Sequence, residues 1–384
     1  MSDGMAWEWP RDGSTGTIGV EEEFLLVNPA TGDPMPHIES VMSCTAGRVT
    51  REFVQELVES STPICNSRDE VLEALVELRA QLARGAALSG SAIAGIGVHA
   101  FAAPESLTLT QSDRYHHMSG ALPWTWREAT TCGMHVHIGV ADRDRAIDVC
   151  DRLRSYLPVL LAMSVNSPLW RGEPTGMRSV RTALRRLQPR TGMPPRHGSW
   201  EGFSRRMRAL AQAGVPDGSW VWWAVRPHPT FGTAEVRVFD TQSDVRNAHA
   251  LAAATSALVE HLIETADDDD PFTVYDDELL AESWYNAMRD GTDGLHVFGA
   301  TGQLTTQRLG ESALELAELL EPRLDENIAG RLRVLALWPE ANMQLHDFER
   351  SGCSGAVRAA ADRTTSSCTA ALGSHDRVAT EAPS

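Results

Sequence analysis

The sequence predicts an α+β protein built around an antiparallel β-sheet. Short apolar runs typical of strands are mixed with longer segments of helical periodicity, and the two kinds do not alternate regularly as in a parallel βαβ protein. Neither glycine-rich nucleotide-binding fingerprint is present. GxGxxG does not occur, and the phosphate-binding loop GxxxxGK[ST] cannot occur because the chain contains no lysine.

The first half of the chain supplies strands and two predicted helices. Residues 1–16 form a polar lead, which we expect to be flexible. Val71, Leu75 and Leu82 recur at helical spacing in "SRDEVLEALVELRAQLARGAALSG", which predicts an amphipathic helix. The predicted elements are short strands and turns over 17–66, a helix over 67–90, buried strands at 92–101 and 131–140, and a long helix over 141–167.

The second half is predicted to begin with a loop, continue with one pair of strands and then become mostly helical. The loop segment is rich in arginine, proline and glycine, which indicates a long ordered loop. Helices are expected to continue to about residue 345, and the final dozen residues to be disordered. The predicted ranges are the loop 168–200, a strand, turn and strand over 222–240, a helix over 247–266 and a solvated acidic helix end, "DDDDP", at 267–271.

Composition restricts how this protein can bind anions. The chain has 384 residues and a formal net charge of −18, which argues against a nucleic-acid-binding protein. All 34 basic residues are arginines. Any contact of a cationic side chain with a phosphate or carboxylate must therefore come from an arginine, barring a protonated histidine.

The N-terminus and the cysteines predict a cytoplasmic location. "MSDGMAWEWPRDG" lacks the basic start and apolar core of a signal peptide. No stretch approaches the roughly 20 apolar residues of a membrane span. The six cysteines contain no CxxC pair and are interpreted as free thiols. We therefore expect no association with a membrane.

Three adjacent glutamates lie inside an apolar strand, "TIGVEEEFLLV". Alternation along a strand puts Glu21 and Glu23 on one face and Glu22 on the other. Two carboxylates at i and i+2 repel each other unless a cation lies between them, and oxygen ligands suit Mg²⁺ or Mn²⁺. The alternative is that one face of the strand is simply solvated.

A second acidic strand is predicted in "EFVQELVESSTPIC". Glu59 is its candidate ligand, and Glu52 lies seven residues earlier at the entry of the strand. An edge strand with charged positions explains the same pattern without a metal.

Two later strands carry further ligand-type side chains. His135 and His137 share one face of "CGMHVHIGV", as two ligands, or as one ligand and one substrate or structural contact. In "GTAEVRVFD", Glu235 and Arg237 share one face, while Val236, Val238 and Asp240 share the other. Glu235 can bind metal and Arg237 a phosphate, or the two can form a cross-strand ion pair.

An arginine-rich loop completes the candidate site. Its functional interpretation is the capture of carboxylates and phosphates, and its alternative is charge balance against nearby acids. Four strands that collect carboxylates, histidine and arginine suit phosphoryl transfer, in which the protein mainly positions groups and neutralises charge. The loop arginines are Arg178, Arg181, Arg185, Arg186, Arg190 and Arg196.

These motifs together resemble the carboxylate–amine ligases of the type 2 glutamate–cysteine ligase family. The resemblance rests on "TIGVEEEFLLV", "ESSTPIC", "TCGMHVHIGV", "RTALRRLQPRTGMP" and "RPHPTFGTAEVRVFDTQ", in the order of the family. It implies a catalytic domain over 17–345 with a glutamine-synthetase-like fold, a curved antiparallel sheet flanked by helices. The segment 346–384 matches poorly and is expected to be partly disordered.

The resemblance also implies a reaction and its cofactors. Members use ATP and Mg²⁺, with Mn²⁺ as an alternative, to activate a carboxylate as an acyl phosphate that an amine attacks. The usual products are γ-glutamylcysteine, ADP and phosphate from L-glutamate, L-cysteine and ATP. The implied partners are therefore small molecules, with a homodimer left open.

Roles for individual residues follow from the same resemblance. Arg237 is expected to face phosphate and to stabilise the transferred group. Arg181 is expected to hold the substrate carboxylate. The implied metal ligands are Glu21, Glu23, Glu52, Glu59, His135 and Glu235.

Departures from the family pattern bear on the choice of substrate. Ala224 stands where the pattern often has an acidic residue, and Met134 where it often has cysteine. The same chemistry on a different acid and amine is therefore an alternative. A metal-dependent hydrolase and a non-catalytic binding protein are the others.

Overall fold

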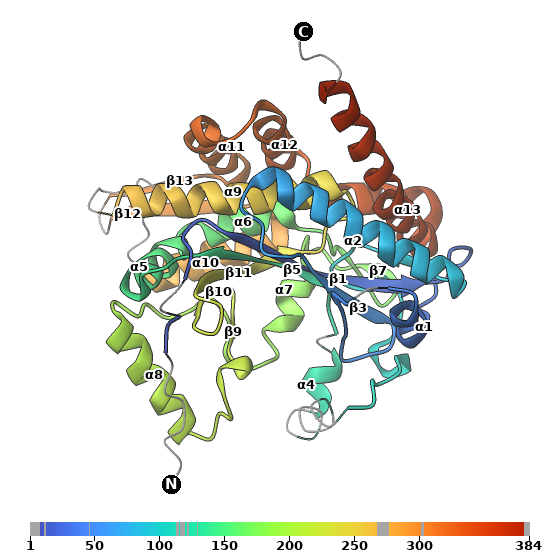
Figure 1. Ribbon diagram of the computed structural model, residues 1–384, viewed down its shortest axis with the longest axis horizontal. Coiled ribbons are helices and arrows are strands. Elements are labelled where there is room, and N and C mark those ends of the chain that lie inside the picture. The colour runs from blue at the N-terminus through green and yellow to red at the C-terminus, as the bar shows by residue number, and fades with distance from the viewer. Residues whose placement is uncertain are drawn as a thin grey trace.

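A seven-stranded antiparallel sheet forms the middle of the molecule, with helices on both sides (Figure 1). The computed structural model describes residues 8–10, 13–45, 47–112, 115, 120, 123–128, 130–266, 276–300 and 303–379. The strand order is β10-β11-β5-β1-β3-β2, and β4 also pairs with β1. The strands are β1 (Ile18–Val27), β2 (Val49–Arg51), β3 (Leu57–Ser61), β4 (Ala92–Ala94), β5 (Gly133–Gly139), β10 (Val225–His228) and β11 (Thr233–Asp240).

Helices cover the upper face of the sheet in Figure 1, and shorter elements lie below it. The apolar core lies between the sheet and this upper layer, where Val20, Val136 and Val236 from three strands pack against Leu251 and Leu258. The upper helices are α2 (Arg68–Leu88), α9 (Val245–Glu264), α11 (Leu309–Leu320), α12 (Glu326–Leu337) and α13 (Glu340–Ala379). Below lie α4 (Pro123–Glu128), α7 (Val180–Arg185) and α8 (Trp200–Gln212).

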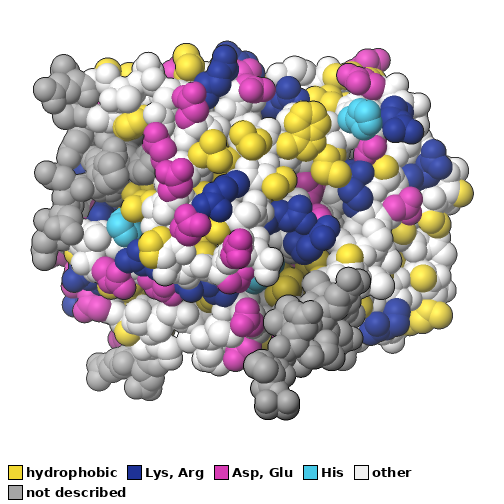
Figure 2. All heavy atoms as spheres, turned by 90° about the horizontal axis from the view of Figure 1, so that it is seen from above, with side chains coloured by type: hydrophobic (Ala, Val, Ile, Leu, Met, Phe, Trp, Pro, Cys, Tyr) yellow, Lys and Arg dark blue, Asp and Glu magenta, His cyan; other side chains and the backbone are white. Residues whose placement is uncertain are grey.

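The remaining elements are short or peripheral. Figure 2 looks down on the helix-covered side, where acidic and basic side chains are interspersed. The other helices are α1 (Ile38–Ser43), α5 (Arg143–Leu153), α6 (Leu157–Ser164) and α10 (Asp277–Asp290). Two-stranded ladders join β6 (Leu169–Trp170) to β7 (Glu173–Pro174), β8 (Thr191–Gly192) to β9 (Trp222–Trp223), and β12 (Leu295–Ala300) to β13 (Gln303–Arg308).

The α+β prediction is confirmed, and three predicted elements are shorter or divided. The strand expected at 92–101 ends at Ala94, and the chain then passes close to Gln242, whose carbonyl oxygen would lie 2.5 Å from a Cβ atom at Gly95. The single helix expected over 141–167 is two helices, since Pro158 lies in the first turn of α6 and cannot donate a backbone hydrogen bond to a preceding turn. The loop expected at 168–200 contains α7.

The two ends of the chain are held by packing where they are described. Trp9, within the lead predicted to be flexible, is buried and donates its indole N–H to the carbonyl of Val140 at 3.0 Å. Beyond residue 345, Ala356 and Ala360 of α13 pack in the core, and Thr364 accepts a hydrogen bond from the backbone N–H of Gly95. The acidic run 267–271, the side chains of the final dozen residues and the backbone from 380 onward lie outside the described residues.

We find no helix in the described ranges with the length and apolar character needed to cross a bilayer.

Candidate active site

The six predicted metal ligands form two groups of three. Glu21, His135 and Glu235 make up the histidine-containing group, in which one ligand atom from each residue lies within 4.8 Å of the others. The same limit holds within the all-carboxylate group, which consists of Glu23, Glu52 and Glu59. The sequence predicted the residues but not this division.

Strand register explains the two groups. β5 lies between β1 and β11, so that Glu21 is directly opposite His135, and His137 is directly opposite Glu235. On the other side of β1, Glu23 is opposite Glu59 of β3. Alternation keeps these side chains on the face of the sheet that is turned away from α2.

Beside the histidine-containing group, His137 has one buried nitrogen with no hydrogen-bond partner within the described chain. His135 Nδ1 lies 3.0 Å from Glu21 Oε2, and His137 Nδ1 lies 3.0 Å from Thr233 Oγ1. His137 Nε2 makes no hydrogen bond within the described chain and lies 3.7 Å from Glu21 Oε1 and 3.8 Å from Glu235 Oε1. Burial opposes ionisation of Glu21, but the two histidines hold the pKa of its carboxyl below the usual range.

Two arginines bind the carboxylate of Glu235. Arg237 forms an ion pair with it within the same strand, rather than across strands as the alternative interpretation of the sequence had it. Arg226 of β10 binds it as well and is opposite Glu235 in the β10–β11 hairpin. Burial raises the pKa of Glu235, but the two guanidinium groups hold it well below the usual value. Sequence reasoning missed Arg226, although counting back across the turn of "RPHPTFGTAE" gives this pairing.

The all-carboxylate group is crowded with negative charge. Glu23 accepts a hydrogen bond from the backbone N–H of Gly133 at 2.5 Å, and Glu59 accepts one from the hydroxyl of Thr50 at 3.0 Å. Burial and then the neighbouring Glu52 raise the pKa of Glu59 well above its usual value. A divalent cation offsets such repulsion, and oxygen donors suit Mg²⁺ or Mn²⁺. The donor set therefore fits the implied metal ions.

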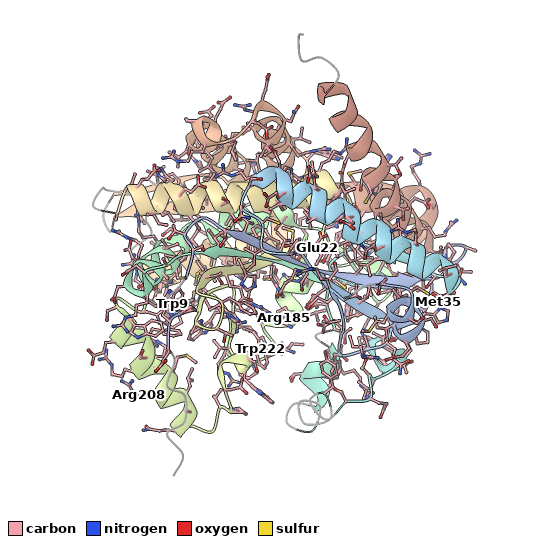
Figure 3. The ribbon with its side chains drawn as sticks, in the orientation of Figure 1. Trp9, Glu22, Met35, Arg185, Arg208 and Trp222 are labelled. Atoms are coloured by element: carbon pink, nitrogen blue, oxygen red, sulfur yellow. The ribbon has the colours of Figure 1, made fainter. Side chains whose placement is uncertain are left out.

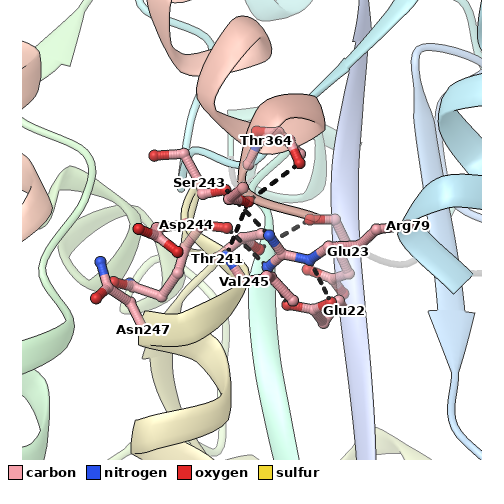
Figure 4. Close-up of polar contacts among 12 residues, drawn as sticks. Glu22, Glu23, Arg79, Thr241, Ser243, Asp244, Val245, Asn247 and Thr364 are labelled. Carbon is pink, nitrogen blue, oxygen red and sulfur yellow. Dashed lines mark hydrogen bonds and ion pairs between the residues drawn. The ribbon is translucent and has the colours of Figure 1, made fainter. Parts of the chain in front are cut away.

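The face of β1 that carries Glu22 is not solvated. Glu22 is 1% exposed, and Arg79 of α2, which is 0% exposed, donates to both of its carboxylate oxygens at 2.6 and 2.9 Å (Figure 4). The predicted division of the three glutamates between two faces is confirmed. The face that carries Glu22 is not the solvated one, because Arg79 of α2 covers it.

A register shift changes the face on which β11 ends. Strict alternation predicted Val238 and Asp240 on the face of Val236, but the register shifts between Val236 and Phe239. Phe239 is therefore opposite Met134, and the prediction is wrong for this end of the strand. Asp240 instead lies 3.7 Å from the guanidinium of buried Arg181.

Arg181 lies against the backbone beside the all-carboxylate group. Its guanidinium donates to the carbonyl oxygens of Val238 at 3.3 Å and Arg237 at 3.2 Å, and its Nε has no partner within the described chain. A side chain at Gly133 would meet this guanidinium at 2.1 Å and would displace it, so glycine here makes room for Arg181. Whether Arg181 also reaches a substrate stays a prediction.

Arg185 lies one turn further along α7 and lines the same narrow cavity as Arg181, Arg237 and Trp222 (Figure 3). The described residues give its side chain no hydrogen bond or ion pair. Burial, with Arg237 and Arg181 nearby, lowers the pKa of Arg185 to about 9. An anion in this cavity would offset the repulsion among the three guanidinium groups.

A second and larger cavity of about 670 Å³ lies beside Arg226, on the side of the histidine-containing group. Its volume is in the range of cavities that take a whole small ligand. Phe203, Met207, Trp223 and His228 supply aromatic and apolar walls. Burial lowers the pKa of His228 to about 4.

Two solved ligases share this fold. The glutamate–cysteine ligase of Francisella tularensis, determined in complex with AMP, superposes with a TM-score of 0.64 at 13% identity, covering 97% of this chain and 96% of that one. The bifunctional glutathione synthetase of Pasteurella multocida gives a TM-score of 0.67 at 14% identity, with 92% of this chain matched to 52% of that protein. The predicted fold class is thus confirmed.

Sequence comparisons identify the family. A relative from Rubrobacter xylanophilus, described as a putative glutamate–cysteine ligase 2-1, is 33% identical over 91% of this chain and 94% of its own. A glutamate–cysteine ligase from Halobacterium salinarum is 37% identical over 74% of this chain and 81% of its own. The model of glutamate–cysteine ligase family 2 (GCS2) matches residues 17–333. The chain belongs to this family and is an enzyme of the glutamate–cysteine ligase type.

Proposed function

We propose that this enzyme uses ATP and Mg²⁺ to join a carboxylate to an amine through an acyl phosphate. L-Glutamate and L-cysteine are the first candidates, which would give γ-glutamylcysteine, ADP and phosphate. The observation that carries the proposal is the arrangement of six ligand-type residues in two groups on one face of the sheet, flanked by arginines.

Divalent cations would be held by Glu21, His135 and Glu235, and by the three members of the all-carboxylate group. Bound there, they supply neutralisation of phosphate charge. The unpartnered Nε2 of His137 faces the same group and can contact either a cation or a phosphate oxygen.

The two cavities suggest where each substrate binds. The cavity of about 670 Å³ has aromatic walls and the histidine-containing group beside it, which suits a nucleotide with its phosphates toward Arg226 and Arg237. The narrow cavity is lined by Arg181, Arg185 and Arg237 and suits the carboxylate of the acid. Arg237 would then face the phosphoryl group between them.

Product release tests the proposal directly. ADP is measured with the acid alone, the amine alone and both together, and the product mass identifies the acid and amine from a panel. A ligase requires ATP and both substrates for full turnover. A hydrolase turns over without ATP, and a binding protein releases no ADP, so either result would reject the proposal.

The two histidines of β5 are expected to differ. His135→Ala should raise the Mn²⁺ concentration for half-maximal activity more than His137→Ala does, because His135 belongs to the closely spaced group. Mn²⁺ titrations of the two variants measure this difference. A larger shift for His137→Ala would reverse their roles.

The arginines of α7 are expected to act on the acid substrate. Arg181→Met and Arg185→Met should each raise KM for the acid about 10- to 100-fold, the effect of losing one charge-assisted hydrogen bond, with KM for ATP nearly unchanged. Arg181→Met should also lower the melting temperature, because it leaves buried Asp240 without its guanidinium partner. Steady-state kinetics and thermal melting separate the two effects. Weaker ATP binding with an unchanged acid would contradict the assignment.

A further inference from the structure

The two candidate metal groups are joined by one residue of the backbone. Glu21 belongs to the histidine-containing group and Glu23 to the all-carboxylate group, and Glu22 lies between them. Because alternate side chains of a strand point to opposite faces, Glu22 points away from both groups. A displacement of the backbone at Glu22 would nevertheless move both neighbouring carboxylates.

Arg79 fixes Glu22 with almost all of its hydrogen-bonding capacity. Besides its two bonds to the Glu22 carboxylate, its guanidinium donates to the carbonyl of Ser243 at 3.0 Å and to that of Gln242 at 2.9 Å. A guanidinium has five N–H donors, and these four bonds are made in a fully buried position (Figure 4). The geometry allows little sliding of β1 relative to this loop.

The loop whose carbonyls accept hydrogen bonds from Arg79 directly follows β11, the strand that carries Glu235 and Arg237. The hydroxyl of Thr241 donates to the backbone carbonyl of Glu23 at 2.8 Å, so the loop also contacts β1 directly. The end of β11 is thereby tied to β1 across the start of β5. These ties connect strands that contribute to both groups.

A buried carboxylate holds the other side of the same loop. Glu340 of α13 accepts hydrogen bonds from the backbone N–H groups of Ser243 at 2.7 Å and Asp244 at 2.9 Å. Arg79 thus binds the loop through its carbonyls and Glu340 through its amides. The segment is fixed from two helices, α2 and α13.

We propose that Arg79 is a positioning residue that, through Glu22 and the 242–243 carbonyls, sets the spacing between the two cation-binding groups. The inference rests on the proposed function, since it assumes that both groups bind cations. The alternative is a pair that contributes only stability. Replacing a buried ion pair by apolar side chains is often neutral for stability, so the two roles can be separated.

The test uses the double variant Glu22→Leu/Arg79→Leu, with Mn²⁺ as the probe. Titration calorimetry gives the number and affinity of Mn²⁺ sites without nucleotide, and electron paramagnetic resonance reports the coupling between two bound ions. We expect the variant to fold, to bind Mn²⁺ about 10- to 100-fold more weakly and to show altered coupling between the two ions. A loss of this size is typical when a residue that positions a metal ligand is removed.

Arg154→Leu is the matched control, because Arg154 is also buried and binds the carboxylate of Asp277 and the carbonyl of Pro194. It should lower stability and leave Mn²⁺ binding unchanged.

The outcomes distinguish this inference from the function on which it rests. Native Mn²⁺ affinity and coupling in a folded double variant would overturn the role of Arg79. If that variant does not fold, Arg79→Lys replaces it, because lysine keeps the charge but cannot span Glu22 and both carbonyls. Native Mn²⁺ binding in Arg79→Lys would overturn the inference equally. Failure of the unmodified enzyme to bind Mn²⁺ at two sites would reject the two-cation premise instead.

Discussion

Replacing Glu21 or Glu23 by glutamine is expected to abolish cation-dependent turnover while the protein stays folded. Each residue supplies a carboxylate to a different group, and strand pairing holds the backbone of each in place. An amide of the same shape keeps that pairing but removes the negative charge. Losing about 4 kcal/mol of transition-state charge stabilisation corresponds to roughly a thousandfold loss in rate. Steady-state rates over a Mg²⁺ series, with circular dichroism, measure the effect.

Glu22→Gln is the matched control, one residue away on the opposite face. It should lower stability, because it removes the negative charge of the buried pair with Arg79, and any loss of cation affinity should be smaller than in the two ligand variants, because the amide oxygen still accepts a hydrogen bond from Arg79. Disrupting one partner of such a pair typically costs about 3–5 kcal/mol. The melting temperature should fall markedly, and turnover below it should fall much less than in Glu21→Gln or Glu23→Gln. Equal loss of activity at all three positions, with unchanged melting, would contradict the assignment of faces.

Arg237→Met is expected to lower kcat with a smaller effect on KM for either substrate. Arg237 lies at the narrow cavity and beside the histidine-containing group, where phosphoryl charge would develop. That charge is greatest in the transition state, so the loss appears in kcat. Removing one such donor typically costs about 2.7–4 kcal/mol, or a hundredfold to a thousandfold in rate. Kinetics with ATP, acid and amine varied in turn measure it.

Arg226→Met separates phosphate contact from the support of Glu235. Arg226 binds the same carboxylate but is also tied to the backbone carbonyls of Gly218 and Val221. If the two arginines merely hold Glu235, their replacements should lower kcat equally. A larger loss for Arg237→Met supports its contact with phosphate, and near-native kcat in that variant would mean that no such contact exists.

Local sequence patterns predict the ligand residues because alternation along a strand is a short-range property. Glu21 and Glu23 share a face whatever strand lies beside them, and the same holds for His135 and His137. The division into two groups depends on β5 lying between β1 and β11, and no local pattern encodes that order. The sequence also did not predict the register between the end of β11 and β5, because no glycine or proline marks the shift after Val236.

The sequence also did not predict hydrogen-bond partners that come from distant segments of the chain. Arg79 follows Leu78 in a helix whose apolar spacing was recognised, and a single arginine there reads as a surface residue. Its burial is explained only by Glu22 of β1 and the loop after β11. Near the end of the chain, the packing of Ala356 and Ala360 of α13 in the core likewise depends on distant segments.

The division of ligands between strands has a consequence for the order in which the chain can fold. The all-carboxylate group is contained within residues 23–59, whereas the histidine-containing group spans residues 21–235. Closing the longer loop costs roughly 1.5 kcal/mol more chain entropy, since each doubling of loop length adds about 0.6 kcal/mol. Contacts of low sequence separation form first, and synthesis delivers the N-terminal segment first. A nascent chain can thus assemble one of the two candidate cation sites from β1, β3 and the residue after β2 while β11, which completes the other, is still being translated.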